Sequence, residues 1–389
     1  MPRTNRREFA CKIESTAGVA ESLSASDLLV RIRDGDTWNF AVDLYDTEEV
    51  QGASRMRPQL PGLGTVDATI SHFLRGPASQ TTKPANSPML RSAMLEELQI
   101  KNLSIGAITG GPFTHGETIT GGTSSATAKV FRDTANGAAV IKFHTVTGTF
   151  QSAETITGGT SGATATTSST AADNGWMYRT TDSEFDGVDT DHHVTCGFNQ
   201  DGQRIVSRGS LANLQMEFQV GRAAIVTQRF VGAKASHGDV ALALPSSYPE
   251  ESNAAPRFVA STLTLGGYTP NSIQSLSLNI ETNPGLREDS QEADGIKFTD
   301  YEKIAPIISL DPAQDDYATW DVLASLAGGT TFAVGWKCGG TPGLIWEFFA
   351  DEVQYTSVDQ GSERTHAKTP IELRCNGTST RSDIYIWVH

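Results

Sequence analysis

Residues 214–220 read LQMEFQV, and their strict alternation decides the fold. Leu214, Met216, Phe218 and Val220 are separated by polar residues. Because successive side chains of a strand point to opposite faces, this pattern predicts a half-buried β-strand with one apolar and one polar face. The same alternation returns at residues 275–281, 344–348, 371–375 and 384–388. Clusters of Gly, Asn, Asp and Pro separate these segments, so we expect a mostly β fold of two packed antiparallel sheets, a β-sandwich or barrel.

Two short segments carry a helical pattern instead. Asp315 or Asp316 caps the first segment, and Gly328-Gly329 ends it. Its apolar side chains at helical spacing are Trp320, Leu323, Ala324 and Ala327. Ser87 caps the second segment, where Pro88 lies in the first turn. Its apolar stripe is Leu90, Met94 and Leu98. We expect both helices to pack on the sheets, one of them as a short flanking helix.

A repeat interrupts the chain between these regions. ETITGGTSSATA at residues 117–128 recurs as ETITGGTSGATA at residues 154–165, with eleven of twelve positions identical. Each copy predicts a strand, a tight Gly-Gly turn and a returning strand. We expect a small inserted β module over residues 105–170, which buries little and forms a mobile surface insertion. It divides a larger domain into residues 1–104 and 171–389.

Composition and charge exclude some classes of function. The 389 residues hold 30 Lys and Arg against 45 Asp and Glu, a net charge of −15. Such a surface repels polyanions, so a conventional duplex-DNA-binding protein is disfavoured. No stretch approaches the roughly 20 apolar residues that span a bilayer, and the first dozen residues lack the apolar core of a signal peptide. We therefore expect no membrane insertion and synthesis in the cytoplasm.

Residues that could carry catalysis or hold a cofactor are sparse. The sequence has no phosphate loop ending GK[ST], no GxGxxG, no HExxH and no GxSxG. We expect neither an enzyme nor a cofactor. Cys11, Cys196, Cys338 and Cys375 lack metal-ligand spacing and are expected to be buried thiols, although Cys338 and Cys375 could meet across strands.

One acidic run resembles half of a calcium-binding loop. Asp182, Glu184, Asp186 and Gly187 occupy positions 1, 3, 5 and 6 of that pattern, but His193 stands where the bidentate Glu is required. A solvated acidic loop is the favoured interpretation, and a bound cation stays open. His192 and His193, next to Asp191, would point to opposite faces of a strand, so a packing role is expected rather than joint metal binding.

The C-terminal half resembles the tail tube protein, or major tail protein, of long-tailed bacteriophages. The resemblance rests on four stretches in this order: residues 197–233 (GFNQDGQRIVSRGSLANLQMEFQVGRAAIVTQRFVGA), 272–295 (SIQSLSLNIETNPGLREDSQEADG), 315–339 (DDYATWDVLASLAGGTTFAVGWKCG) and 371–377 (IELRCNG). Residues 28–77 also resemble the opening of that family. The ETITGG repeat is similar to segments of phage virion proteins.

The resemblance implies a subunit of hexameric rings that stack into a tube. Implied partners are further copies of the chain and the tape-measure, terminator and distal tail proteins, and the implied location is the virion after assembly in the host cytoplasm. DNA would pass through without specific binding. An acidic lumen fits this role because it repels the phosphates.

Two groups of residues become candidates for the tube's surfaces. The lumen-facing candidates are Gln215, Glu217, Gln219, Ser275, Ser277, Asn279 and Glu281; these side chains could equally face the exterior or a neighbouring subunit. A loop at residues 46–64 is expected to stack rings through opposite charges. Its candidates are Asp46, Glu48, Glu49, Arg55 and Arg57; the alternative is a solvated loop.

Other interpretations stay open at this point. Residues 1–7 form a polar arm that could cross to a neighbour, and the module could decorate the tube exterior, either as plain bulk or in contact with host glycans. A baseplate ring, a capsid decoration protein or a glycan-binding adhesion protein would also explain an acidic, β-rich chain. A hydrolase that uses the acidic loop near His192 is the last alternative.

Overall fold

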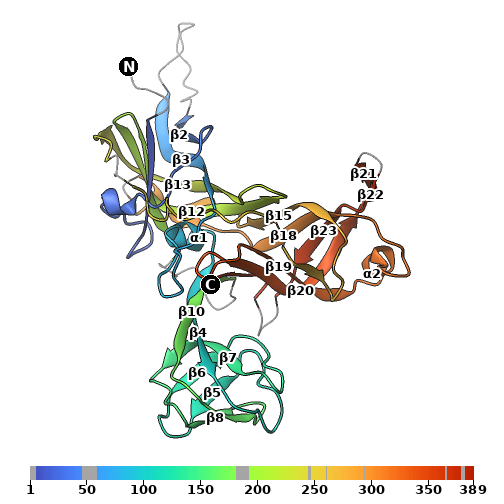
Figure 1. Ribbon diagram of the computed structural model, residues 1–389. Coiled ribbons are helices and arrows are strands. Elements are labelled where there is room, and N and C mark those ends of the chain that lie inside the picture. The colour runs from blue at the N-terminus through green and yellow to red at the C-terminus, as the bar shows by residue number, and fades with distance from the viewer. Residues whose placement is uncertain are drawn as a thin grey trace, which may run out of the picture.

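Antiparallel strands make up most of the molecule, as the alternating sequence predicts. The computed structural model describes residues 6–45, 59–180, 192–243, 247–259, 261–292, 294–363, 366–377 and 382–389. Twenty strands form one continuous hydrogen-bonded network, and two further strand pairs stand apart from it. The network curls on itself, so that its faces pack against each other around separate cores (Figure 1).

The first part of the network contains the N-terminal strands. Its strands, in hydrogen-bonded order, are β1 (Arg7–Ile13), β11 (Val194–Gln200), β12 (Gln203–Gln219), β13 (Ile225–Asp239), β3 (Leu60–Phe73) and β2 (Thr37–Tyr45). Between its curled faces, the ring centroids of Phe198 and Phe230 each lie 5.3 Å from that of Phe9. The register of β12 shifts between Arg208 and Leu211. A buried carboxylate, Glu14, accepts a bond from the Gly209 amide at this shift.

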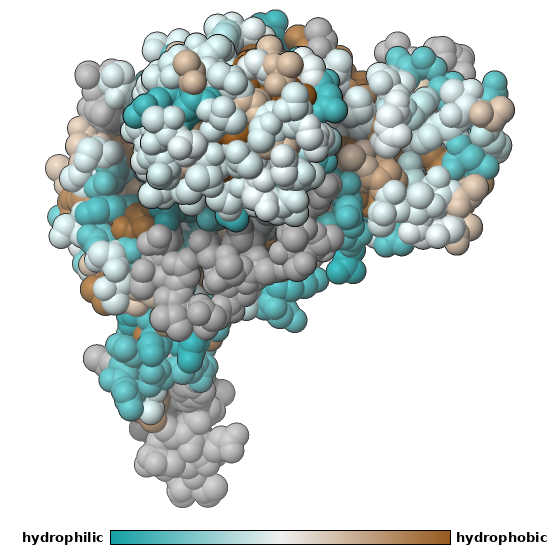
Figure 2. All heavy atoms as spheres, turned by 90° about the horizontal axis from the view of Figure 1, so that it is seen from below, coloured by the Kyte–Doolittle hydropathy of each residue, from teal (hydrophilic) through white to brown (hydrophobic). Residues whose placement is uncertain are grey.

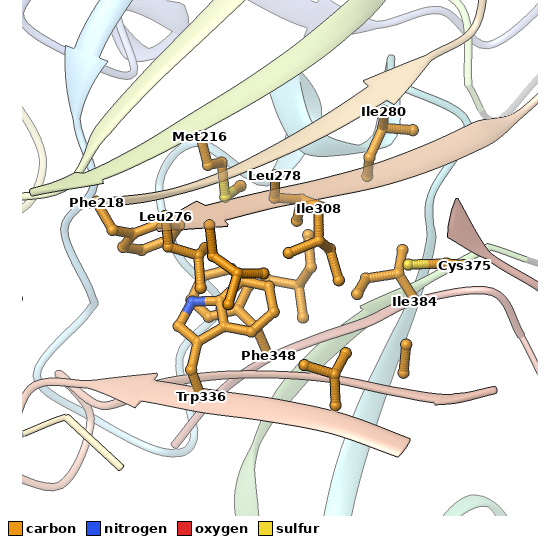
Figure 3. Packing of buried hydrophobic residues seen from close by; sticks show 14 of the residues in the cluster. Met216, Phe218, Leu276, Leu278, Ile280, Ile308, Trp336, Phe348, Cys375 and Ile384 are labelled. Atoms are coloured by element: carbon orange, nitrogen blue, oxygen red, sulfur yellow. The ribbon is translucent and has the colours of Figure 1, made fainter. Parts of the chain in front are cut away.

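The second part is a sandwich that continues from β12. One sheet adds β15 (Ile273–Glu281), β18 (Ala305–Pro312) and β23 (Ile371–Cys375); the other contains β14 (Leu263–Leu265), β19 (Thr331–Cys338), β20 (Trp346–Val358) and β24 (Tyr385–Val388). Figure 3 shows the apolar side chains of the two sheets interleaved. Trp336 stacks on Phe348 at 4.9 Å, and Phe218 meets both rings edge-on. The expected pair of packed antiparallel sheets is confirmed.

Short elements complete the body. A 3-10 turn, η1 (Ala25–Asp27), follows β1. The pairs that stand apart from the main network are β16 (Gly285–Glu288) with β17 (Ile296–Asp300), and β21 (Gly361–Glu363) with β22 (His366–Lys368). Of these, β17 contacts β12 and β13, and its Phe298 lies against Gly209 at the register shift of β12.

The helix α2 (Val322–Ala327) is shorter than predicted, and most of its expected stripe is wrong. Asp321 caps it by accepting a bond from the Ala324 amide at 2.9 Å, so the helix begins several residues after Asp316. This later start leaves fewer than two turns. Val322 is the buried side chain, whereas Leu323 is 45% exposed and Ala324 and Ala327 are also exposed. The stop at Gly328-Gly329 is confirmed, because the helix ends at Ala327.

The other helix, α1 (Ser87–Arg91), also ends early. Asn86 rather than Ser87 is its cap residue, and Met94 adopts the left-handed conformation at φ +61°, which stops the helix. Leu90 and Met94 are buried as expected. Leu98 lies in the next strand, β4 (Glu96–Ser104), and so does not belong to the helical stripe.

The inserted module hangs below the body on two paired strands, β4 and β10 (Ala172–Arg179) (Figure 1). It contains β5 (Thr118–Gly121), β6 (Thr127–Val130), β7 (Val140–Thr147), β8 (Thr155–Gly158) and β9 (Thr164–Thr166). The predicted hairpins are present, since β5 pairs with β6 and β8 with β9. Seen from below, the surface of this part is mostly of intermediate hydropathy (Figure 2).

The expectation that the module buries little is wrong. It has its own core, in which Phe113, Phe143 and Phe150 are completely buried together with Ile119 and Ile156. The aromatic side chains come from segments outside the two repeats, whose own contributions are Ile and Ala. The core therefore could not be seen from the repeat alone.

The two repeats hold each other through their glutamates. The Glu117 carboxylate accepts bonds from the amides of Thr160 and Ser161 in the second copy, at 3.1 and 3.0 Å. Glu154 accepts the corresponding bonds from Thr123 and Ser124 in the first copy. Burial alone would raise the pKa of each carboxyl, but these donors outweigh it and hold the pKa below its usual value. Because β5 also pairs with β8, the copies form one pseudo-symmetric unit.

An aromatic contact packs the module against the body. Phe131, from the module, is completely buried and lies edge-on to Phe349, Tyr385 and Trp387 of β20 and β24, at 5.6, 6.2 and 5.6 Å. Beside it, the Arg132 guanidinium lies 3.1 Å from a Glu347 carboxylate oxygen. The module is therefore joined to the sandwich by packing as well as by β4 and β10.

All four cysteines are buried free thiols, as predicted. The two that meet are a different pair from the one suggested by the sequence. Cys11 and Cys196 stand directly opposite each other in β1 and β11. Cys338 and Cys375 lie on β19 and β23, which each pair with β20 and not with each other.

Candidate functional site

The seven lumen-facing candidates lie together on one face of the sheet. The register of β12 and β15 places Gln215 opposite Asn279, Glu217 opposite Ser277, and Gln219 opposite Ser275. Glu281 follows two residues after Asn279, on the same side. The intervening residues of both strands point into the sandwich core. The sequence could predict that the polar residues of each strand share one face, because alternation fixes the face even before the register is known.

This face continues across the neighbouring strands. On one side β13 and β3 add exposed or half-buried polar residues, and on the other side β18 and β23 do so. We call the whole surface the polar sheet face: Asp67, Thr69, Ser71, Gln215, Glu217, Gln219, Thr227, Arg229, Ser275, Ser277, Asn279, Glu281, Ser309, Asp311, Glu372 and Arg374. It spans six strands, of which the sequence prediction identified two.

The charges on the polar sheet face are largely balanced. Cations stand against three of its five carboxylates: Arg229 Nε lies 3.1 Å from Asp67, Lys303 Nζ 3.9 Å from Glu281, and Lys368 Nζ 3.0 Å from Asp311. Glu217 and Glu372 have no cation within 4 Å in the described residues. Exposed ion pairs of this kind contribute at most about 1 kcal/mol each. The face is thus hydrogen-bonding and mildly acidic, and the net charge of −15 is not concentrated on it.

Three of these five carboxylates line one open groove of about 480 Å³ on this face, together with Asp359 at its edge. Glu217, Asp311, Asp359 and Glu372 line it, with serine hydroxyls between them. Asp311 also accepts bonds from the amides of Gln274 and Ser275, which fixes its carboxylate at the start of β15. Lys368 is the cation that offsets the groove's charge.

The ring-stacking candidates Asp46, Glu48, Glu49, Arg55 and Arg57 lie outside the described residues. The hairpin that leads to them is described. Its last pair is Tyr45 with Leu60, and the neighbouring Leu44 lies opposite Pro61. Leu44 and Leu60 are 57% and 58% exposed. We call residues 41–45 and 60–65 the hairpin arm, which rises from the top of the body in Figure 1.

The histidine candidates are packed inside the described part of the chain. His192 and His193 are both buried, and their ring nitrogens lie 3.1 Å from the Arg91 carbonyl and 2.8 Å from the Thr299 carbonyl, respectively. The His193 ring also packs edge-on to Phe298. The acidic loop 182–191 lies outside the described residues. Elsewhere in the described ranges, no three His, Cys, Asp or Glu side chains are placed to hold a metal ion.

Sequence reasoning missed a second cavity, of about 370 Å³. It lies where β3 ends, between residues 29–34, the start of α1 and residues 248–251. Burial raises the pKa of Glu250 in its wall to about 7. The run LLVRIR at residues 28–33, apolar with two arginines, was the available sequence signal. The partners of that run come from far along the chain, so the cavity itself could not be inferred.

Comparisons with known proteins leave the family unassigned. In the described part of the chain, no helix is both long enough and apolar enough to span a lipid bilayer. No protein-family model matches the sequence, and no curated protein matches it either.

Proposed function

We propose that the protein is a structural subunit that assembles into stacked hexameric rings and forms the tail tube of a long-tailed bacteriophage. The observation that carries the proposal is the polar sheet face. It is a curved, six-strand surface of hydroxyl, amide and carboxylate groups without a free row of lysines, as a conduit for DNA requires. The resemblance of residues 197–233 and 272–295 to tail tube proteins supports the same function.

An open sheet edge supports assembly. Strand β2 pairs only with β3 among the described strands, so its outer backbone groups face away from the sheet. Strand β1, at the other margin, pairs only with β11 among the described strands, but its residues 8–11 are buried within the chain. The exposed edge of nine residues at β2 invites pairing with another chain, and closing many copies into a ring removes it.

The mildly acidic face suits passage of DNA better than binding. Protein–DNA affinity depends mainly on cations that neutralise phosphates. On this face Arg229 is paired with Asp67, and the exposed Arg374 stands against two carboxylates without a cation in the described residues, Glu217 and Glu372. Serine and amide groups between them keep the surface hydrated. A DNA-conducting wall is therefore the function that this surface fits best.

Electron microscopy of the purified full-length protein tests the proposal. We expect hollow filaments of stacked rings with sixfold symmetry at near-neutral pH and moderate salt. Single closed rings that never stack would favour a baseplate component instead. A protein that stays monomeric at high concentration would overturn the proposal and favour an adhesion protein.

A further inference from the structure

We propose that Cys11 and Cys196 are a redox-sensitive pair, which forms a disulfide in the presence of a low-molecular-weight disulfide and stays open under reducing conditions. We call these two residues the thiol pair. The bond joins β1 to β11 and holds the first strand of the chain on the body. The inference goes beyond the proposed tube, because it rests on the pairing of these two strands and not on assembly.

The register of β1 and β11 brings the two thiols together. Cys11 and Cys196 are direct partners in this antiparallel pair, whose register runs without a shift from Arg7 to Ile13. The side chains of direct partners lie on the same face of a sheet. Both side chains belong to the N-terminal apolar core. The thiols therefore face each other from neighbouring strands.

Hydrogen bonds at both ends of β1 show which kind of partners the cysteines are. The Glu14 amide donates to the His193 carbonyl at 2.9 Å, and the Asp201 amide donates to the Arg6 carbonyl at 2.7 Å. Hydrogen-bonded and non-hydrogen-bonded partners alternate along an antiparallel pair, so the thiol pair is of the non-hydrogen-bonded kind. The Cα atoms of such partners lie about 4.5 Å apart, and a disulfide spans roughly 4.4–6.8 Å. The backbone therefore already has a spacing that a disulfide requires.

The surroundings of the thiol pair slow exchange in both directions. Cys11 is 1% exposed and Cys196 is completely buried, next to Phe9 and Phe198. Burial raises the pKa of Cys196 well above its usual value, and the Cys11 thiol and the Glu14 carboxylate raise it further. Because exchange requires a thiolate, both formation and reduction of the bond are slow while β1 is in place.

The position of β1 gives the oxidant a route to the thiol pair. Strand β1 lies at the margin of the network and pairs only with β11 among the described strands. Strands near a chain end open locally at a lower free energy than strands in the middle of a core. Opening of this one strand pair brings both thiols to solvent, and the sandwich and the module stay closed.

Formation of the bond is a two-electron exchange between two thiols and oxidised glutathione. One cysteine thiolate attacks a glutathione sulfur, forms a mixed disulfide and releases one glutathione thiolate. The second cysteine thiolate attacks the protein sulfur of the mixed disulfide and releases the other glutathione. The protein sulfurs are oxidised, the glutathione disulfide is reduced, and the two thiol protons end on the two glutathiones. Cytoplasmic glutathione keeps such a pair open, whereas oxidising surroundings outside a cell favour the bond.

The other two cysteines provide an internal control. Cys338 and Cys375 are also buried, and burial raises the pKa of Cys338 to about 12. Cys338 stands opposite Trp346, and Cys375 stands opposite Val353, on strands that pair with β20 and not with each other. Their partners are seven residues apart along β20. A disulfide between them would require movement of the backbone, so both should stay free under the conditions that close the thiol pair.

Thiol mapping of the full-length wild-type protein tests the bond. One sample is incubated folded with oxidised glutathione, and a second is refolded from urea in the same buffer, so that slow access cannot hide the equilibrium state. Iodoacetamide in denaturant then labels the remaining thiols, and peptide mass spectrometry locates the bond.

We expect both samples to contain one intramolecular bond between Cys11 and Cys196, with Cys338 and Cys375 alkylated. Absence of this bond from both samples, or an equally abundant bond that involves Cys338 or Cys375, would overturn the proposal. A bond in the refolded sample alone would overturn local opening of β1 as the route to the thiols. The result does not depend on whether rings form, so the tube and the thiol pair fail separately.

Hydrogen exchange at the Glu14 amide, which bonds across the two strands, measures the effect on β1. Oxidation should slow this exchange about tenfold or more relative to the same protein in dithiothreitol, because a disulfide restricts the open state. Equal exchange in oxidised and reduced wild type would show that the bond does not hold β1 on the body.

Two double variants complete the test. Cys338→Ala with Cys375→Ala removes the same number of thiols and should keep the difference between oxidised and reduced protein. Cys11→Ala with Cys196→Ala should abolish it. Circular dichroism shows whether each variant is folded, and the comparison within the wild type needs neither variant. A difference that persists without the thiol pair would overturn its role.

Discussion

Ser125 is the residue at which the two repeats differ. It occupies the left-handed region at φ +57°, and its counterpart in the second copy is Gly162 at φ +69°. Both close the same turn, because the amides of Ser125 and Gly162 donate to the carbonyls of Gly121 and Gly158. A serine in this conformation has a steric cost that glycine lacks. The first copy therefore has the more strained turn.

Exchanging these two residues should shift stability in opposite directions. Ser125→Gly should stabilise the module by about 1 kcal/mol, and Gly162→Ser should destabilise it by a similar amount. A side chain at position 162 meets no atom within 4 Å, so backbone strain alone decides the sign. Differential scanning calorimetry measures both as shifts of the melting temperature by about 2 °C or more, in opposite directions. Shifts of the same sign would contradict this account.

Glu250 makes stability depend on pH. Its pKa is 4.5 when exposed and about 7 in the folded protein, because burial disfavours the charged form. The folded state therefore gains from this group below pH 4.5, and that gain is lost as the pH rises to about 7. A shift of this size corresponds to at most about 3 kcal/mol.

Glu250→Gln should weaken that pH dependence, because the amide stays neutral and still accepts from the Ala85 amide. Urea unfolding at pH 5 and pH 8 measures the difference. Between these conditions the wild type should lose more stability than the variant. Equal losses in both proteins would show that Glu250 is not buried as described.

At the scale of single elements, alternation predicted the half-buried strands better than helical spacing predicted the helices. The segment at residues 384–388 is an exception, because β24 is buried on both faces. The strands β12, β15 and β23 have the buried faces that their sequences predict. Val220, the last residue of the deciding stretch, is 52% exposed because β12 ends at Gln219. The prediction of α2 failed because Asp321 caps the helix by accepting a bond from the Ala324 amide. This local bond overrode the longer apolar pattern. Local hydrogen bonds decide where a short helix begins.

The crossed carboxylates give a prediction about the module's turns. Glu117→Ala removes the acceptor of the Thr160 and Ser161 amides, which belong to the other copy. Hydrogen exchange at these two amides should accelerate by about tenfold or more, because losing a bond to a charged group costs roughly 1.5–3 kcal/mol. The Thr123 and Ser124 amides, held by Glu154, should stay slow.

Glu154→Ala is the matched control for this experiment. It should release Thr123 and Ser124 and leave Thr160 and Ser161 protected. Faster exchange in the same copy as the substitution would show that each glutamate stabilises its own turn instead.

For the whole molecule, the sequence predicts the composition of the layers but not their arrangement. Cys11 and Cys196 face each other across 185 residues of chain, and Asp67 reaches Arg229 across 162. Such pairings depend on the register of distant strands, which no local pattern encodes. The polar sheet face was therefore only partly predictable, and the cavity at the end of β3 was not. Hexameric assembly and the tail tube stay predictions.

The charge of the polar sheet face can be tested on assembled tubes. Glu217→Lys with Glu372→Lys should leave assembly unchanged and make the tubes retain a short labelled DNA duplex at low salt. The retained fraction should fall as salt rises, in co-sedimentation with the duplex. Wild-type tubes should retain little at any salt concentration.

Glu292→Lys with Asp316→Lys gives the control for that experiment. It makes the same change in net charge at exposed sites off the polar sheet face. Equal DNA retention by both double variants would show that overall charge matters and that this face does not line the channel.

The crossed glutamates of the module also constrain how such a segment can change over generations. A chain that lost one copy of the repeat would keep a carboxylate with no turn to hold and a turn with no carboxylate. Duplication of one copy alone would create the same mismatch. Copies of the repeat should therefore be gained and lost in pairs, and related chains should carry an even number of copies.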